Sequence, residues 1–408
     1  MQPAYRCLAG IDVHKKMLAV VVRNDRGEFF RRSFGTTRQE ILNLAAWLDE
    51  HQVQEVAMES TAQYWRPVWY GLEPHVRLLL SHPLSTRAPR GRKQDFRDAR
   101  RLVDRLWAGD LEKSFVPCAE QRAWRWLTRT RVELKRRIGQ IRGQVEGLLE
   151  EAGIKLSAAV SDVFGASGWA MLEQLAAGES DAGKLAEQAR GSLRHKKELL
   201  KEALAGHCNP ITRLLLGQSL EQVRLLQQQI AEIGAELSRQ LRDHSSVLCR
   251  LSQVPGIELG AAQELLAEIG VDAAAFPSAA QFASWVGVCP GQQESAGVSY
   301  STRSPKGNRY LRRLLCQLGW AAARTRGTFF AELFARLSPK LGAKAAAWAV
   351  AHRLARIVWV LLRRGEAYVE RGPSPANPQR LRRKFRRLLS ELSRAGIDPS
   401  ELLSQPSV

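Results

Sequence analysis

Residues 7–22, CLAGIDVHKKMLAVVV, decide the fold of the first part of this chain. The stretch is apolar and rich in β-branched side chains, and the polar residues 24–27 (NDRG) separate it from a second extended run at residues 28–34. Two such runs joined by a short turn predict a β-hairpin. Asp12 stands mid-strand among apolar neighbours, where a lone charge is disfavoured unless it has a function.

The segments that follow alternate between helical and strand patterns. Thr37 and Glu40 resemble the start of a capped helix, in which apolar residues recur at helical spacing up to His51. The next expected elements are a strand at 55–58, a helix through Trp65 and Trp69, a strand at 76–80 and a helix at 94–106 (QDFRDARRLVDRL). This order predicts an α/β sheet with helical crossovers.

Four acidic residues fall where such a sheet could gather them: Asp12, Glu59, Asp95 and Asp98. Glu59 directly follows the strand at 55–58, at the edge of the sheet where α/β proteins bind ligands. Asp95 and Asp98 lie three residues apart, on one face of their helix. Carboxylate oxygens suit Mg²⁺ or Mn²⁺, and a pair of such ions can hold the attacking and leaving oxygens of a phosphoryl transfer.

Each acid also has an ordinary explanation. Asp95 and Asp98 lie among six lysines and arginines within residues 90–101, and could form surface salt bridges. Glu59 could stabilise the start of the following helix through the helix dipole. For His14 a structural or phosphate-contacting role is favoured over metal binding, because no other histidine lies at ligand spacing.

The charge balance indicates a polyanionic partner. The 408 residues carry 61 lysines and arginines against 41 acids, a net charge of +20. Basic side chains that neutralise phosphates release counterions, so nucleic acid is the expected partner. An anionic membrane is the rival, but the positive charge is spread over many segments, and three basic residues interrupt the most apolar stretch, 345–362.

The cysteines and the first residues predict a reduced, cytoplasmic protein. The six cysteines are scattered, with none in a C-x-x-C pair, which argues against a zinc site and a disulfide framework. The apolar run at the start of the chain meets Asp12 and then two lysines, unlike a secretory leader.

After residue 118 the pattern changes to long helices with two heptad seams. The seams consist of Leu134, Ile138, Ile141, Val145 and Leu148, and of Val223, Leu226, Ile230, Ile233 and Leu237. They could pack on each other within one chain or form a dimer interface. Residues 153–206, between the seams, are helical in composition.

The chain beyond Leu251 is predicted to be helical up to Glu370. Within it, residues 254–270 (VPGIELGAAQELLAEIG) resemble a helix-hairpin-helix in which Gly256 and Gly260 flank the turn and backbone N–H groups bind phosphate. A plain pair of antiparallel helices is the alternative.

The last segment combines a predicted linker with a basic helix. Residues 372–378 are rich in glycine and proline, and residues 380–389 (RLRRKFRRLL) follow them. In so basic a chain a nucleic-acid contact is favoured for this helix over a solvated surface.

Three segments of the first part resemble the motif blocks of the DEDD insertion-sequence transposases. This family includes the bridge-RNA-guided serine recombinases and is related to the Piv-type DNA invertases. The segments are GIDVHKK (10–16), ESTAQYW (59–65) and GRKQDFRDARRL (91–102). The resemblance implies a ribonuclease H-like (RuvC-like) N-terminal fold, with catalytic, metal-binding acids at Asp12, Glu59, Asp95 and Asp98.

Residues 276–322 resemble the C-terminal transposase domain of the same family, including its SPKGN run at 304–308. In that family a serine followed by glycine, shortly before this run, is the nucleophile, and the matching position here is Ser295. Cations would activate such a hydroxyl and stabilise its transition state.

This chain departs from the family pattern near that serine. Ala296 separates Ser295 from the next glycine, and Gly291 stands where an arginine often follows the preceding proline. The competing nucleophiles are therefore Ser299, Ser301 and Ser304.

The resemblance also implies partners. These are donor and target DNA, a structured guide RNA and further copies of the chain, as a dimer assembling to a tetramer in the nucleoid of a prokaryotic cytoplasm, with no membrane. In that family the acids and the serine come from different protomers. Nucleic-acid contacts are expected at Lys15, Arg92, Lys93, Gly256, Gly260, Lys306, Asn308, Arg309 and Arg312.

The expected organisation has four parts. They are a RuvC-like DEDD catalytic domain at 1–118, a helical coiled-coil region at 119–245, a mainly α C-terminal transposase domain with the serine nucleophile and the helix-hairpin-helix at 246–371, and a linker with a basic tail at 372–408. Two other functions fit the residues: a metal-dependent nuclease or junction resolvase that uses water, and a non-enzymatic nucleic-acid-binding protein.

Overall fold

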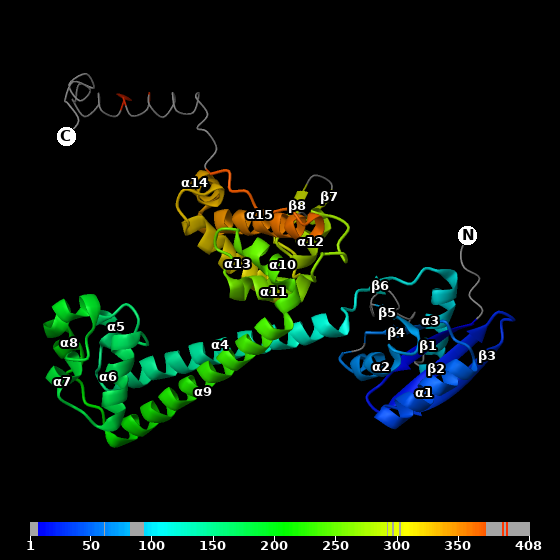
Figure 1. Cartoon of the computed structure of the whole chain (residues 1–408), viewed down its shortest axis with the longest axis horizontal. Coiled ribbons are helices and arrows are strands. Elements are labelled where there is room, and N and C mark those ends of the chain that lie inside the picture. The colour runs from blue at the N-terminus through cyan, green and yellow to red at the C-terminus, as the bar shows by residue number, and fades with distance from the viewer. Residues whose placement is uncertain are drawn as a thin grey trace. The chain divides into compact units, whose positions relative to one another are not determined.

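The computed structural model describes residues 7–60, 62–81, 94–291, 293–295, 298–301 and 303–372, together with 386, 389 and 390. The chain forms two compact units that divide between Pro117 and Cys118 (Figure 1). The boundaries at 245 and 371 stay predictions. Arg92, Lys93, the linker and most of the basic helix at 380–389 lie outside the described residues.

The first unit is a six-stranded mixed sheet with helices on both faces (Figure 1). Its strands, in the order β3-β2-β1-β4-β5-β6, are β1 (Cys7–Val13), β2 (Met17–Asn24), β3 (Phe29–Gly35), β4 (Glu55–Glu59), β5 (Arg77–Ser81) and β6 (Lys113–Ser114). Its helices are α1 (Arg38–Glu50), α2 (Trp65–Leu72) and α3 (Asp95–Ala108). The α/β prediction is confirmed, and β6 is an additional strand.

The stretch 7–22 corrects the prediction of a two-stranded hairpin. It contains two strands, and with β3 they form an antiparallel meander. The polar residues His14, Lys15 and Lys16 make the extra turn, in which the N–H of His14 donates to the carbonyl of Met17 at 3.0 Å. Asp12 therefore lies next to the end of β1 rather than in the middle of a longer strand.

Alternate residues of β1 face the two helical layers. Ala9, Ile11 and Val13 join the core that includes α1 and α2. Leu8 joins the core formed with α3, and Gly10 directly contacts that helix. Since side chains of a strand alternate between faces, Asp12 lies on the α3 side of the sheet.

The second unit is built on two long helices, α4 (Ala119–Glu151) and α9 (Pro210–Gln240), which pack along each other (Figure 1). The two seams therefore meet within one chain, and a dimer interface stays a prediction. Short helices share a core with one end of this pair: α5 (Leu156–Ala159), α6 (Ala166–Ala177), α7 (Ala182–Ala186), η1 (Gly191–Lys196) and α8 (Lys197–Ala203).

The rest of this unit is a helical cluster around a large apolar core. It comprises η2 (Arg242–His244), α10 (Ser245–Ser252), α11 (Leu259–Ile269), α12 (Ala279–Val286), α13 (Arg309–Arg324), α14 (Phe329–Leu341) and α15 (Ala343–Arg364). Helix α15 is long and apolar enough to cross a membrane, yet half of its most apolar window is buried inside the unit. That burial is ordinary for a core helix.

Two predictions for this region are wrong in detail. A hairpin of β7 (Gln293–Ser295) and β8 (Val298–Ser301) interrupts the segment expected to be wholly helical. The first helix of the expected helix-hairpin-helix is α10, so residues 254–258 are the turn and Gly260 lies inside α11. Gly256 has a φ of +86°, and a Cβ there would lie 2.8 Å from the N atom of Ala322 in α13, which explains the glycine by packing.

Candidate metal centre and serine hairpin

Two of the predicted metal-binding acids meet at His14. The Nε2 atom of His14 lies 3.2 Å from Oδ2 of Asp12 and 3.1 Å from Oδ1 of Asp95. One ligand atom from each of these residues lies within 4.8 Å of the other two, a spacing that one metal ion can bridge. His14 was not expected to join these acids, and the structure adds it to the candidate ligands.

A close approach between β1 and α3 creates this cluster. A Cβ at Gly10 would lie 2.2 Å from the carbonyl oxygen of Ala99, so only glycine lets α3 cross β1 at this distance. Asp12 lies two residues beyond Gly10 on the same face of the sheet, and Asp95 lies one helical turn before Ala99. The crossing therefore brings the two carboxylates together.

Glu59 reaches the same side of the sheet from the neighbouring strand. Strands β1 and β4 run parallel, with Ile11 paired to Met58. Asp12 and Glu59 are the next residues along, and Ala57, two residues before Glu59, packs with α3. Two acids thus leave the carboxyl ends of adjacent parallel strands on one face.

Asp98 lies one turn after Asp95 on α3 and forms the salt bridge that was its alternative explanation. Its Oδ1 accepts a hydrogen bond from Nη1 of Arg101 at 3.0 Å. Asp98 is not among the three described residues whose ligand atoms lie within 4.8 Å of one another, so its place in the metal site stays a prediction.

The donor set fits a divalent cation. Carboxylate oxygens suit Mg²⁺ and Mn²⁺, and an imidazole nitrogen is a common ligand of transition metals. The Nε2 atom of His14 lies 3.1 to 3.2 Å from an oxygen of each acid. The three ligand atoms are therefore close enough to bind one cation together.

The candidate nucleophile lies in the short hairpin of the second unit. Ser295 is the last residue of β7, and its Cα pairs with that of Val298 in β8. The competitors Ser299 and Ser301 lie in β8, whereas Ser304 lies in the loop after it.

The two ends of this hairpin approach each other closely. A Cβ at Gly291 would lie 1.9 Å from the carbonyl oxygen of Arg303, so glycine is required where the chain closes the hairpin. This packing accounts for the departure from the family's arginine at that position.

The loop before α13 is held by residues predicted to contact nucleic acid. Asn308 caps α13 by accepting hydrogen bonds from the N–H groups of Tyr310 and Leu311 at 2.9 and 3.2 Å. Arg312 donates to the carbonyl of Pro305 and to Oγ of Ser304, both at 2.8 Å. These contacts give both side chains a structural role that the sequence did not reveal.

The other described residues of that set are more open. Lys15 and Lys306 are exposed in turns, and Arg309 is exposed with its guanidinium donating to the hydroxyl of Tyr310 at 2.7 Å. Gly260 is half-buried, and its carbonyl accepts a hydrogen bond from Arg131 at 2.8 Å. Lys15, Lys306 and Arg309 are therefore accessible to a phosphate.

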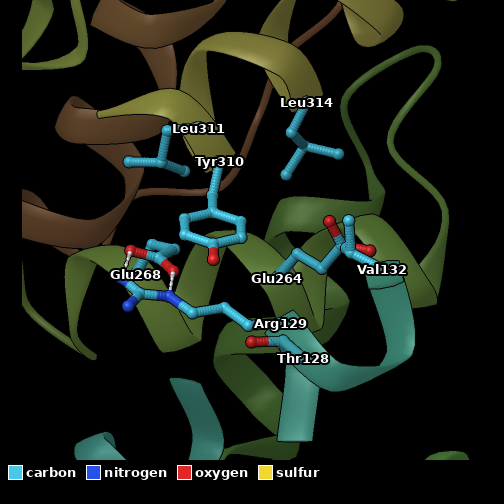
Figure 2. A pocket seen from close by; sticks show the side chains of 8 residues that line it. All are labelled: Thr128, Arg129, Val132, Glu264, Glu268, Tyr310, Leu311 and Leu314. Atoms are coloured by element: carbon cyan, nitrogen blue, oxygen red, sulfur yellow. Dashed lines mark hydrogen bonds and ion pairs between the residues drawn. The ribbon is translucent and has the colours of Figure 1, made fainter. Parts of the chain in front are cut away.

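A buried polar network joins α4, α11 and α13, as Figure 2 shows. Glu268, which is 3% exposed, accepts hydrogen bonds from Arg129 at 2.7 and 2.9 Å and from Asn308 at 3.0 Å. The Arg129 guanidinium also lies 4.4 Å from the ring centroid of Tyr310. The hollow between these side chains is about 10 Å³, enough for one water molecule, so the network is a brace and not a ligand pocket.

Two further arginines of α4 take part in this network. Burial lowers the pKa of Arg125 and of Arg131, and the nearby charges of Glu268 and Glu264 oppose these shifts. Arg125 donates to the carbonyl of Glu268 at 2.6 Å. These cations are therefore committed to the protein interior.

The α/β fold and the acidic cluster fit one class of protein, the DNA transposases of the DEDD type. Residues 9–154 match the DEDD transposase family, and residues 249–334 match the family described as Transposase IS116/IS110/IS902. The chain belongs to this IS110/IS116/IS902 family of transposases. Membership implies an enzyme that cleaves DNA and has DNA as its partner.

Two bacterial relatives agree with this assignment. A family 20 transposase of Pseudomonas aeruginosa is 26% identical over 322 residues, which cover 77% of this chain and 85% of that protein. A transposase of Sinorhizobium fredii, y4pF/y4sB, is 25% identical over 328 residues, which cover 77% of this chain and 74% of that protein.

Proposed function

We propose that this transposase is a metal-dependent recombinase that cleaves and rejoins DNA through a covalent phosphoserine intermediate. The observation that carries the proposal is the cluster of Asp12, His14 and Asp95, with Glu59 beside Asp12 on the next strand. Acids that are gathered at the carboxyl ends of parallel strands suit phosphoryl transfer. In this proposal the first unit is RuvC-like.

The acids and the serine have separate tasks. Asp12, Glu59, Asp95 and Asp98 would hold Mg²⁺ or Mn²⁺, and the bound ion would stabilise negative charge on the scissile phosphate. Ser295 would form the new Oγ–P bond as the bond from phosphorus to the departing strand end breaks. The serine loses its proton and the departing oxygen gains one. Because one phosphodiester bond replaces another, the exchange is reversible without ATP.

Ser295 is favoured because it holds the position that matches the nucleophile of the family. Ser304, whose Oγ accepts a hydrogen bond from Arg312, is a competitor. Ser299 and Ser301 stay alternatives that covalent trapping separates.

We also propose the partners. A structured RNA that pairs with donor and target DNA would supply sequence recognition, consistent with a chain of net charge +20. The protein would act in the prokaryotic nucleoid as a dimer that assembles to a tetramer, with acids and serine from different protomers.

Trapping on suicide DNA tests the nucleophile. The unaltered protein should form an adduct that survives denaturation, Ser295→Ala should form none, and the matched Ser299→Ala should still form it. An adduct in Ser295→Ala refutes the assignment. If the unaltered protein cleaves DNA but never forms an adduct, the rival nuclease that uses water is correct.

A second experiment tests the metal centre. Asp95→Asn should abolish Mg²⁺- or Mn²⁺-dependent cleavage while DNA binding persists, because the basic surface is unchanged. Asp49→Asn, on the exposed side of α1, is the matched control and should cleave normally. Undiminished cleavage by Asp95→Asn at saturating metal would refute the metal site. If Asp12→Asn also left DNA processing unchanged, the result would favour a non-enzymatic nucleic-acid-binding protein.

A further inference from the structure

A row of arginines lies on α3, away from the apolar side chains with which that helix packs on the sheet. Arg97, Arg101 and Arg105 are four residues apart, so they follow one side of the helix. Together with Arg100 they line an open cleft of about 450 Å³. We call these four residues the α3 arginine row.

Aromatic rings fix part of this row. The Arg100 guanidinium lies 4.1 Å from the ring centroid of Phe29, and Arg23 lies 5.6 Å from the same ring and 4.4 Å from that of Trp107. Cation–π contacts orient a guanidinium while its N–H edges can still donate. Because two guanidiniums already contact Phe29, that ring is poorly placed to stack on a nucleic-acid base.

The surface keeps an excess of positive charge. Arg23 and Arg100 share Asp104, Arg101 pairs with Asp98, and Arg105 pairs with Asp110. Arg97 is exposed, and its guanidinium has no ion pair or hydrogen bond within the described part of the chain. Five arginines against three aspartates leave two positive charges in excess, with the unpaired one nearest the start of α3.

The row begins at the candidate metal centre. Arg97 and Arg101 stand on either side of Asp98, and Asp95 is the first residue of the helix. From Arg97 to Arg105 the row spans about 12 Å at about 1.5 Å per residue. One strand of B-DNA places a phosphate about every 3.4 Å along its axis, so the row can follow roughly three or four phosphates.

We infer that the α3 arginine row binds the phosphate backbone of the DNA strand that enters the metal centre, without reading its bases. This inference rests on the proposed function, since it assumes that DNA is processed at Asp12 and Asp95. It adds a surface that positions the DNA backbone, a role that neither the acids nor the serine supplies.

The test measures DNA binding by the full chain in EDTA, so that cleavage does not contribute. Two fluorescent duplexes of unrelated sequence are titrated across a series of salt concentrations. Arg97→Gln is compared with Arg38→Gln, which removes the same charge at the exposed start of α1, on the opposite face of the sheet. A combined Arg97→Gln, Arg100→Gln, Arg105→Gln variant and the charge-preserving Arg97→Lys complete the set.

The expected result is a slope of log K against log salt that falls by about 0.9 for each phosphate that the variant no longer neutralises. The slope of Arg97→Gln should therefore fall by the equivalent of about one phosphate on both duplexes, and the slope of the combined variant by the equivalent of about two to three. Arg97→Lys and Arg38→Gln should keep the slope of the unaltered protein. Equal decreases in Arg97→Gln and Arg38→Gln, no decrease in Arg97→Gln, or a decrease confined to one duplex would each overturn the inference. Failure of the metal or serine mechanism would appear only in cleavage and would leave these slopes unchanged.

Discussion

Replacing Glu268 with alanine tests the brace that holds the loop before α13. The buried carboxylate accepts three hydrogen bonds, two from Arg129 and one from Asn308. Removing one partner of a buried ion pair costs about 3–5 kcal/mol because it leaves a charge without compensation. The Arg129 side chain is 33% exposed and can regain some hydration, so we expect the lower end, about 3 kcal/mol.

Hydrogen exchange followed by mass spectrometry measures this locally. A loss of about 3 kcal/mol corresponds to exchange on the order of a hundredfold faster in peptides from α11 and α13. Peptides from α1, in the other unit, provide an internal reference. Glu236→Ala is the matched control, because Glu236 also forms an ion pair with an arginine, and the Arg239 and Gln240 side chains lower its pKa to about 2. This pair lies on α9 and is more exposed than that of Glu268, so its loss should leave exchange in α11 and α13 unchanged.

A double replacement separates the network from simple loss of volume. Glu268→Leu combined with Arg129→Met removes both charges and should restore part of the protection lost in Glu268→Ala, since the Arg129 charge is no longer left unpaired and only Asn308 loses its acceptor. A loss of protection below tenfold in Glu268→Ala, or strictly additive effects in the double replacement, would refute the view that this pair braces α13.

Two further predictions concern the packing at Gly10 and the half-buried His352. Gly10→Ala should lower the free energy of unfolding by about 1–3 kcal/mol, because the added methyl group forces α3 away from β1, and it should weaken Mn²⁺ binding. The control Gly139→Ala, on an open part of α4, should raise the free energy of unfolding by about 0.5–1 kcal/mol. Thermal unfolding measures the stabilities and isothermal titration the Mn²⁺ affinity, and an unchanged affinity in Gly10→Ala would contradict the first prediction. Burial, together with Arg356 and Arg353, lowers the pKa of His352, so the unfolded chain binds more protons and stability should fall as pH drops below 6.5. His352→Gln should flatten that dependence, and an equal slope in both proteins would contradict it.

The first unit was largely predictable from sequence because its elements are strongly patterned. The apolar, β-branched run that starts at residue 7 and the helical spacing after Thr37 place the first strands and α1 close to their observed bounds. The short strand β6 was missed, as was the turn at residues 14–16, since three polar residues inside a long apolar run are compatible with either one strand or two.

The candidate metal centre was predictable only in part. The acids are visible as residue types at strand and helix ends, but the meeting of Asp12, His14 and Asp95 depends on the crossing at Gly10. A glycine inside an apolar strand signals such a close approach, although the sequence does not say which helix approaches. His14 could not be added to the site without that contact.

The second unit shows why net charge alone overestimates a nucleic-acid interface. Arg125, Arg129 and Arg131 contribute to the basic total, yet their guanidiniums are bound by Glu268, Glu264 and backbone carbonyls inside the unit. Their contacts span more than a hundred residues of chain, so local pattern cannot reveal them. Arg97 carries the same formal charge without such a partner in the described part of the chain, so its guanidinium is free to neutralise a DNA phosphate and release counterions.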